Sequence, residues 1–293
     1  MMLVRCFQLE GRLVLNDIRT TSGEEYWADL RHRWTSLLSY RYLGRSFANL
    51  DTGPVDPTMI LRHDMRNASG GIMAAPLCIA SPEGGGISDE FAVPNPVIHT
   101  LQILDEAHDV SRIEIVPEVL KLGQRMGFSR SLIIDADNRD RVIAFTSGQG
   151  VSLGDVPEGF EKMEEEKIVV EDSPDLPPLH KVFGASRRDD GHWVLPELVI
   201  ELASPDAALH LGPQHIVLET AATELAAARV GDDRLQMESW QVMFLARGKV
   251  GPFRVDGESF DGAGRTGVRL TLHDEGNQDR AVTAASAVFR QAN

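Results

Sequence analysis

Apolar and polar residues alternate most regularly near the C-terminal end of the chain. In TGVRLTLHD (266–274), apolar Val268, Leu270 and Leu272 are separated by single polar residues. This period of two is typical of a strand in a sheet that has one face exposed to water. Strand character also extends over residues 236–250, 252–260 and 280–290. The pattern therefore predicts a sheet with one solvated face in this part of the chain.

A helix is predicted ahead of these strands. Residues 216–230 read IVLETAATELAAARV, in which Ile216, Ala222 and Leu225 can share one helical face. Gly231, which is followed by two aspartates, ends the helix. Before the helix, the apolar run at 193–203 has strand character. One helix with about five strands indicates the α+β class.

The first half of the chain predicts the same order of elements less regularly. Residues 58–67 precede a helix-like segment at 70–80, where Pro76 would disturb the helix interior or restart the helix. The segment at 81–102 is rich in glycine and proline and has no counterpart in the second half, so we expect an inserted loop that could cover a site. The later strands are expected at 112–122, 131–137 and 141–153.

An internal repeat is indicated by two strand–turn–strand segments. SLIIDADNRDRVIAF (131–145) and LTLHDEGNQDRAVTA (270–284) each have an apolar strand, a polar turn that ends in Asp-Arg, and a second strand. We therefore predict two diverged copies of one unit. Ser22 is a candidate N-cap for an amphipathic helix before the repeat. The expected organisation is a helical N-terminal extension (1–45), a first unit (46–155), an acidic, proline-rich linker (156–192) and a second unit (193–293).

Composition and charge exclude several classes of function. The 293 residues carry a net charge of −15, which argues against nucleic acid or an anionic membrane as a partner. No run approaches the length of about 18 apolar residues that a membrane span requires. Cys6 and Cys78 are the two cysteines, and no CxxC or HxxxH spacing is present, so we expect neither a metal site nor a cofactor. Low cysteine content and the lack of a secretion signal predict a cytoplasmic protein.

The second half resembles the hotdog superfamily, in particular the phenylacetate-pathway type of acyl-CoA thioesterase. The resemblance lies in residues 211–218 (LGPQHIVL), in Glu224, and in the final strand-like segment DRAVTAASAVFR. In that family, Gly-x-x-His-Gly-Gly enters a helix, and a carboxylate follows about nine residues after the histidine. Here His215 and Glu224 have that spacing, but Ile216 and Val217 replace the glycine pair. The first half keeps Gly70 and Gly71 but lacks the histidine, and Cys78 stands at the carboxylate position.

The resemblance implies a tandem double hotdog, in which two units pair and hold a ligand between them. Family sites combine a helix N-terminus of one unit with a carboxylate of the other, and the helix N–H groups suit a developing oxyanion. Gly70 and Gly71 would then form the oxyanion hole, while Glu224 activates water or attacks directly. The mirror site, with His215 and Cys78, would be inactive or would accommodate an acyl chain. Further candidates are Asn67 as a capping or ligand donor, Thr223 as a partner of the nucleophilic water, and Glu219 and Asp64 as rival carboxylates.

The function implied by the resemblance is hydrolysis of an acyl-CoA thioester without a cofactor. A non-catalytic protein that binds acyl-CoA or lipid is an alternative, because each half has lost motif residues. An enoyl-CoA hydratase or dehydratase is a second alternative, although the Asp-x-Asn-Pro-x-His loop of those relatives is absent. Assembly of several such chains into a homo-oligomer would also be in keeping with the family. Five basic residues are candidates for contacts with coenzyme A phosphates: Arg62, Arg66, Arg247, Lys249 and Arg254.

Overall fold

One large antiparallel sheet organises the chain. The computed structural model describes residues 15, 17, 32, 33, 36–43, 57–81, 93–123, 126–153 and 170–291, and within them the sheet has eleven strands. In spatial order, the strands are β1, β3, β4, β5, β2, β10, β13, β12, β11, β7 and β6. Their bounds are β1 Thr58–Ile60, β2 Val93–Ile103, β3 Arg112–Leu122, β4 Met126–Asp135, β5 Val142–Leu153, β6 Ser186–Arg187, β7 Trp193–Leu195, β10 Leu235–Phe244, β11 Phe253–Gly262, β12 Arg265–Asp274 and β13 Arg280–Gln291.

The two halves of the sheet repeat one strand order. Outward from the centre, the first half runs β2, β5, β4, β3 and the second runs β10, β13, β12, β11. The halves join where β2 pairs antiparallel with β10, from Ile98 opposite Met243 to Gln102 opposite Ser239. This pairing makes the sheet continuous, and we call the line between β2 and β10 the seam.

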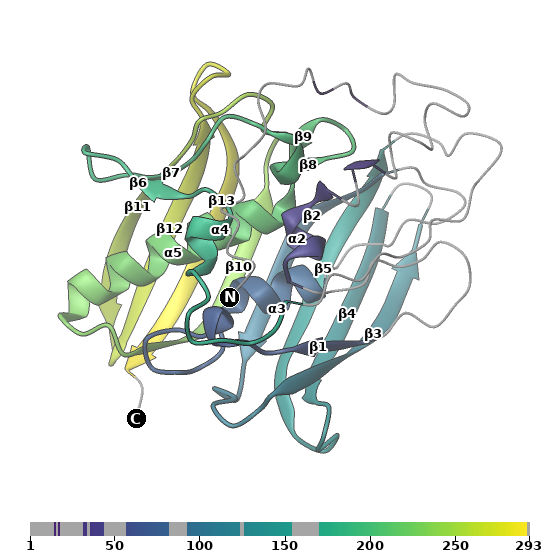
Figure 1. The fold of residues 1–293 in the computed structure, drawn as a ribbon, viewed down its shortest axis with the longest axis vertical. Coiled ribbons are helices and arrows are strands. Elements are labelled where there is room, and N and C mark those ends of the chain that lie inside the picture. Colours follow the sequence, from purple (N-terminus) through teal and green to yellow (C-terminus); the bar gives the residue numbers. More distant parts are fainter. Residues whose placement is uncertain are drawn as a thin grey trace.

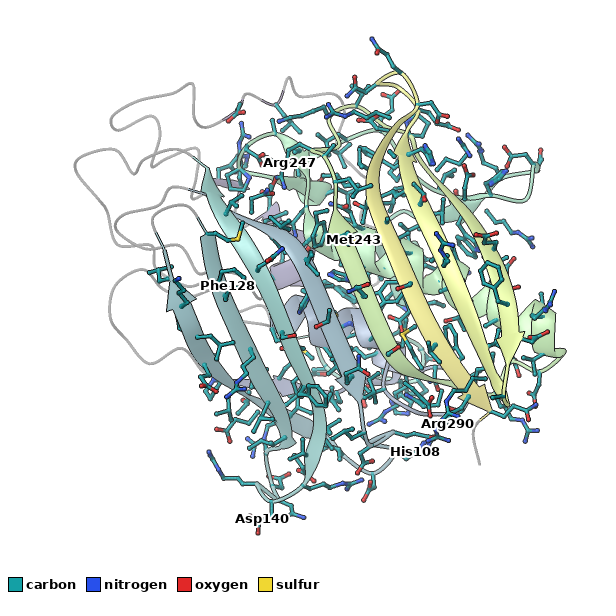
Figure 2. All side chains as sticks on the ribbon, turned by 180° about the vertical axis from the view of Figure 1, so that it is seen from behind. His108, Phe128, Asp140, Met243, Arg247 and Arg290 are labelled. Atoms are coloured by element: carbon teal, nitrogen blue, oxygen red, sulfur yellow. The ribbon has the colours of Figure 1, made fainter. Side chains whose placement is uncertain are left out.

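Helix α3 (Ala74–Ala80) of the first half and the long helix α5 (Leu211–Val230) of the second lie on the same face of this sheet (Figure 1). Seen from behind, the strands lie in front and carry outward side chains such as Phe128 and Met243 (Figure 2). The shorter elements are α2, α4, two 3-10 turns and a two-stranded ladder. The bounds are α2 Leu38–Arg41, α3 Ala74–Ala80, α4 Leu179–Val182, α5 Leu211–Val230, η2 His63–Met65, η3 Ile200–Leu202, β8 Ala203–Ser204 and β9 Ala208–Leu209. An antiparallel sheet with few helices agrees with the predicted α+β class.

The long helix α5 packs closely on the second half of the sheet. Its alanines at 222 and 226 are fully buried, and small side chains let the helix backbone approach the strands. On β11, a Cβ atom added to Gly257 would lie 2.7 Å from Leu225 Cδ1 of α5. The helix ends at Gly231, whose φ of 77° is the left-handed conformation that glycine adopts without strain. The predicted end of this helix is therefore confirmed.

Replacing Gly257 by alanine is expected to destabilise the protein by about 1 kcal/mol, the low end of the range for overpacking, because the contacted atoms are the ends of leucine side chains that can shift. The added methyl group would collide with Leu225 and Leu270. Gly262 on the same strand is the matched control, because a Cβ atom there meets nothing within 4 Å. Urea unfolding of both variants measures the difference. Equal stability of the two variants would contradict the close packing of α5 on β11.

Three sequence-based expectations differ from the structure. The expected insertion at 81–102 contains most of β2, the strand by which the first half joins the second. Pro94 and Pro96 lie outside the stretch paired with β10, so their missing N–H groups leave that pairing intact. The strand expected over 193–203 stops at Leu195, before Pro196, and η3 and β8 follow. The first-half helix begins at Ala74, which places Pro76 in its first turn, where no intrahelical N–H donor is needed.

The predicted N-terminal extension and linker both contribute side chains to the body of the protein. In the extension, Ser39 Oγ lies 2.8 Å from Nδ1 of His210, the residue that caps α5, while Ser22 lies outside the described residues. In the described part of the predicted linker, Leu179 and Phe183 are buried in the core. Both segments thus pack against the body of the protein, and the extension reaches the second half.

Candidate functional site

A cavity of about 490 Å³ lies between the first half, the segment before β7 and helix α5. Its apolar wall is formed by methionine, leucine, proline and tryptophan side chains, and its polar wall by carboxylates, threonines and an amide. This composition is typical of a site for a small organic ligand. The lining residues are His63, Asp64, Arg66, Asn67, Ala68, Met73, Pro174, Leu176, Pro178, Leu179, His180, Trp193, Glu219, Thr220, Thr223, Glu224, Ala227 and Asp233.

Glu219 connects helix α5 to the start of helix α3. Its two carboxylate oxygens accept hydrogen bonds from the backbone N–H groups of Ala74 at 2.7 Å and Ala75 at 2.6 Å. Met73, the N-cap of α3, provides no side-chain acceptor, so the missing cap comes from the other half of the chain. Burial raises the pKa of Glu219 to about 7, although the two N–H groups act in the opposite direction. The group therefore exchanges protons near neutral pH.

Glu224 lines the same cavity in a different environment. Trp193 Nε1 donates a hydrogen bond of 2.9 Å to one carboxylate oxygen, and Arg187 Nη2 lies 3.0 Å from the other. The side chain is 39% exposed, whereas Glu219 is buried. A guanidinium and an indole thus already bind this carboxylate, whereas Glu219 is bound by two backbone N–H groups.

Asn67 and Thr223 also line the cavity, but Gly70 and Gly71 do not. Asn67 Oδ1 accepts a hydrogen bond from the N–H of Gly71 at 3.0 Å, and Gly70 has a φ of 84° in the same turn. The N–H of Gly71 is thus committed to a turn that precedes α3. The helix start that was expected at the glycines lies at Ala74, and its first two N–H groups are those that Glu219 binds.

His215 lies apart from the cavity. The resemblance identified Glu224 by its spacing of nine residues from His215 and assigned the two residues to different sites, and both belong to one continuous helix. Nine residues correspond to about two and a half helical turns, so the two side chains point to opposite sides. His215 faces the seam and is fully buried, and burial holds its pKa well below the usual range. The helix N-cap is His210, whose Nδ1 accepts from the N–H of Gly212.

The five basic residues expected as candidates for coenzyme A phosphates are bonded within the protein. Such pairing reduces their availability to an anionic ligand. Their partners are Asp64 for Arg62, the carbonyl oxygens of Gly70, Ala107 and Val110 for Arg66, Asp206 for Arg247, the Asp206 carbonyl for Lys249, and Glu275 with Asp279 for Arg254.

Comparisons with known proteins show similarity in structure rather than in sequence. No family model matches the chain, and no curated protein sequence matches it. The tesB protein of Mycobacterium avium subs paratuberculosis has a TM-score of 0.54 at 12% identity, covering 84% of this chain and 97% of its own. A putative thioesterase from Novosphingobium aromaticivorans has a TM-score of 0.54 at 11% identity, with 83% and 98% covered.

A third solved structure names the shared fold. A protein of unknown function with a hot dog fold from Alicyclobacillus acidocaldarius has a TM-score of 0.50 at 10% identity, covering 80% of this chain and 92% of its own. At these identities the likeness establishes the fold, and this chain has the hotdog fold. In the described part of the chain, no helix is both long and apolar enough to cross a membrane.

Proposed function

We propose that this protein hydrolyses an acyl-CoA thioester in the cavity, with Glu219 as the general base. The observation that carries the proposal is the buried carboxylate of one half at the helix start of the other, with a pKa raised to about 7. A general base works best when its pKa lies near the operating pH. The fold is also that of solved proteins whose names describe them as an acyl-CoA thioesterase II or as putative thioesterases.

In the proposed reaction, ionised Glu219 accepts a proton from a water molecule that attacks the thioester carbonyl carbon. As Glu219 gains the proton it loses its charge and accepts hydrogen bonds less strongly. The N–H groups of Ala74 and Ala75 then become available to the oxyanion that develops. The carbon–sulfur bond breaks, and the proton passes from Glu219 to the leaving thiolate. Thr223, on the cavity wall, is placed to hold the attacking water.

The proposal includes a tandem arrangement of two hotdog units, at residues 46–155 and 193–293. It is supported by the repeated strand order on either side of the seam and by one helix in each half. The linker at 156–192, the extension at 1–45, a cytoplasmic location and homo-oligomer formation stay predictions. The cavity would lie between the paired units, where Glu219 of the second meets α3 of the first.

Binding of an acyl-CoA or lipid without hydrolysis is the second candidate function. It is favoured by one observation: Glu219 already occupies both N–H groups at the start of α3. If that cap stays in place when a ligand enters, no helix N–H is left for the oxyanion. The hydratase alternative has no such support.

Thiol release from a panel of acyl-CoA substrates tests the proposed function. We expect turnover by the full-length protein, and we expect Ala227→Phe to reduce it because Ala227 lines the cavity. Ala228→Phe is the matched control, since the neighbouring alanine is exposed. Tight acyl-CoA binding without thiol release would support the binding function instead. Equal turnover of the two variants would exclude this cavity as the site.

A further inference from the structure

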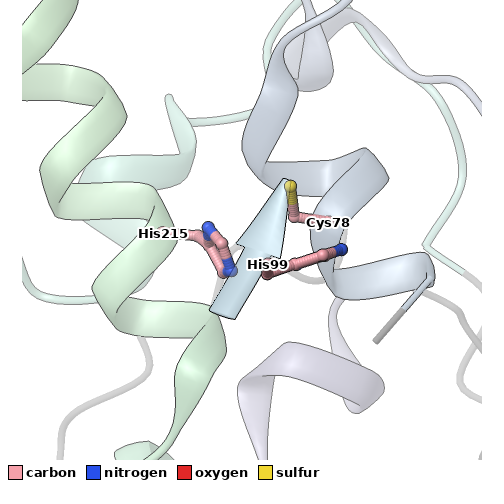
Figure 3. A group of neighbouring side chains, drawn as sticks. All are labelled: Cys78, His99 and His215. Atoms are coloured by element: carbon pink, nitrogen blue, oxygen red, sulfur yellow. The ribbon is translucent and has the colours of Figure 1, made fainter. Parts of the chain in front are cut away.

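A second cluster of reactive side chains lies at the seam, outside the cavity. Cys78 of α3, His99 of β2 and His215 of α5 point toward one another from three elements (Figure 3). The cysteine sulfur and one ring nitrogen of each histidine all lie within 4.8 Å of one another. All three residues are at least 98% buried. The cluster therefore joins both halves in a place closed to bulk water.

Two nitrogen atoms of this cluster have no hydrogen-bond partner among the residues that the structure describes. They are Nε2 of His99 and Nε2 of His215. Buried polar atoms are nearly always paired, so two unpaired nitrogens in a cluster with a cysteine point to a bound group. Burial lowers the pKa of both histidines and keeps their rings neutral, which is the form that ligates metal ions.

The hydrogen bonds at the other nitrogens define which Nε2 carries a proton. His99 donates to the backbone of Ser81, and since its Nε2 is unpaired, the donor is Nδ1. His99 Nε2 thus has an open lone pair. For His215, the indole N–H of Trp240 donates to Nδ1 at 3.0 Å, so the proton of the neutral ring sits on Nε2.

We propose that Cys78, His99 and His215 bind one thiophilic transition-metal ion. Two imidazoles and a thiolate are ligands that Zn²⁺ and Cu⁺ share. Cu⁺ is favoured, because with one thiolate and two neutral imidazoles it gives a net charge of zero in a buried site. The same ligands around Zn²⁺ leave one positive charge. The bound ion would link α3, β2 and α5 across the seam.

Metal binding requires two proton movements. The Cys78 thiol releases its proton, and the proton of His215 moves from Nε2 to Nδ1, which breaks the hydrogen bond from Trp240. One neutral hydrogen bond contributes much less than a set of metal–ligand bonds, so this loss does not prevent binding. The indole N–H of Trp240 loses its hydrogen-bond acceptor when the metal binds. Its NMR resonance therefore reports metal binding.

Metal content and affinity of the full-length protein test the proposal. We expect about one copper ion per chain after expression in copper-supplemented medium, and competition with a Cu⁺ chelator of known affinity gives the binding constant. A parallel preparation with zinc distinguishes the two ions. Cys78→Ser and His99→Gln are each expected to weaken binding at least 100-fold, in line with the loss of a metal ligand. Cys6→Ser is the matched control and keeps full binding.

Two further measurements make the test independent of variant folding. In the wild type, metal binding should shift the indole N–H resonance of Trp240 and raise the melting temperature, because the ion binds the folded chain. Zinc in place of copper would support the site and overturn the choice of ion. Substoichiometric metal in both preparations, or full binding by Cys78→Ser, would overturn the site itself.

Discussion

Replacing Glu219 by glutamine is expected to lower thioester hydrolysis by about 10²–10⁴-fold, the range that a general base contributes. Glutamine has nearly the same shape and can still accept a hydrogen bond from the N–H of Ala74 or Ala75, but it cannot take a proton from water. The measurement is the turnover of the best substrate in the thiol-release assay. Substrate affinity should change much less than turnover.

Two comparisons separate loss of the base from loss of structure. In the wild type, activity should rise with pH through about 7, as Glu219 loses its proton, and the residual activity of Glu219→Gln should lack this rise. Glu224→Gln is the control in the same cavity, and we expect a smaller effect because Arg187 and Trp193 already bind that carboxylate. Full activity of Glu219→Gln, or a larger loss in Glu224→Gln, would refute the assignment of the base.

Acidification of the metal-free protein from pH 7 to pH 5 is expected to lower the free energy of unfolding by a few kcal/mol. Burial lowers the pKa of His99 to about 4, that of His210 to about 3, and that of His215 well below its usual range. These groups bind protons in the unfolded chain near pH 6.5 but not in the folded one. Their stabilising contribution is complete above pH 6.5 and is lost as pH falls, by about 1.4 kcal/mol per group and pH unit.

Glu219 has the opposite effect on the free energy of unfolding between pH 7 and pH 5. Its folded pKa of about 7 lies above the ordinary value of 4.5, so the folded chain holds more protons and is stabilised as pH falls. At pH 5 it offsets about 2 kcal/mol of the loss from the three histidines. Urea unfolding at several pH values measures the net effect. In Glu219→Gln the offset is absent, so its loss should exceed that of the wild type by about 2 kcal/mol. A stability independent of pH in this range would contradict the burial of the neutral histidines.

The elements that sequence analysis predicted well are those whose local pattern matches their environment. β12 alternates because one face is buried, and α5 ends at a glycine that can adopt a positive φ. Strand β2 was mistaken for a loop because Pro94 and Pro96 are poor strand residues. Their position outside the pairing with β10 is set by the tertiary arrangement, which a local pattern does not contain.

The candidate site was predictable in kind but not in its geometry. The idea that a carboxylate of the second half meets a helix start of the first applies to Glu219 and Ala74. The spacing rule favoured Glu224 because it assumed that His215 precedes the helix, whereas α5 begins at Leu211 and includes it. Cys78 and His215, which the resemblance assigned to one mirror site, lie near each other at the seam, and His99 of β2, which the sequence analysis did not single out, joins them there.

The equivalent order of strands on both sides of the seam has an evolutionary consequence. In a dimer of identical subunits, every substitution appears twice, and both symmetry-related positions must tolerate it. Here the two halves are encoded separately, so each can mutate without altering the other. The carboxylate site around Glu219 and the neighbouring cluster around Cys78 can therefore each use residues that have no identical copy in the other half. Joining the halves in a single polypeptide therefore allows equivalent positions of the two halves to carry different chemical groups.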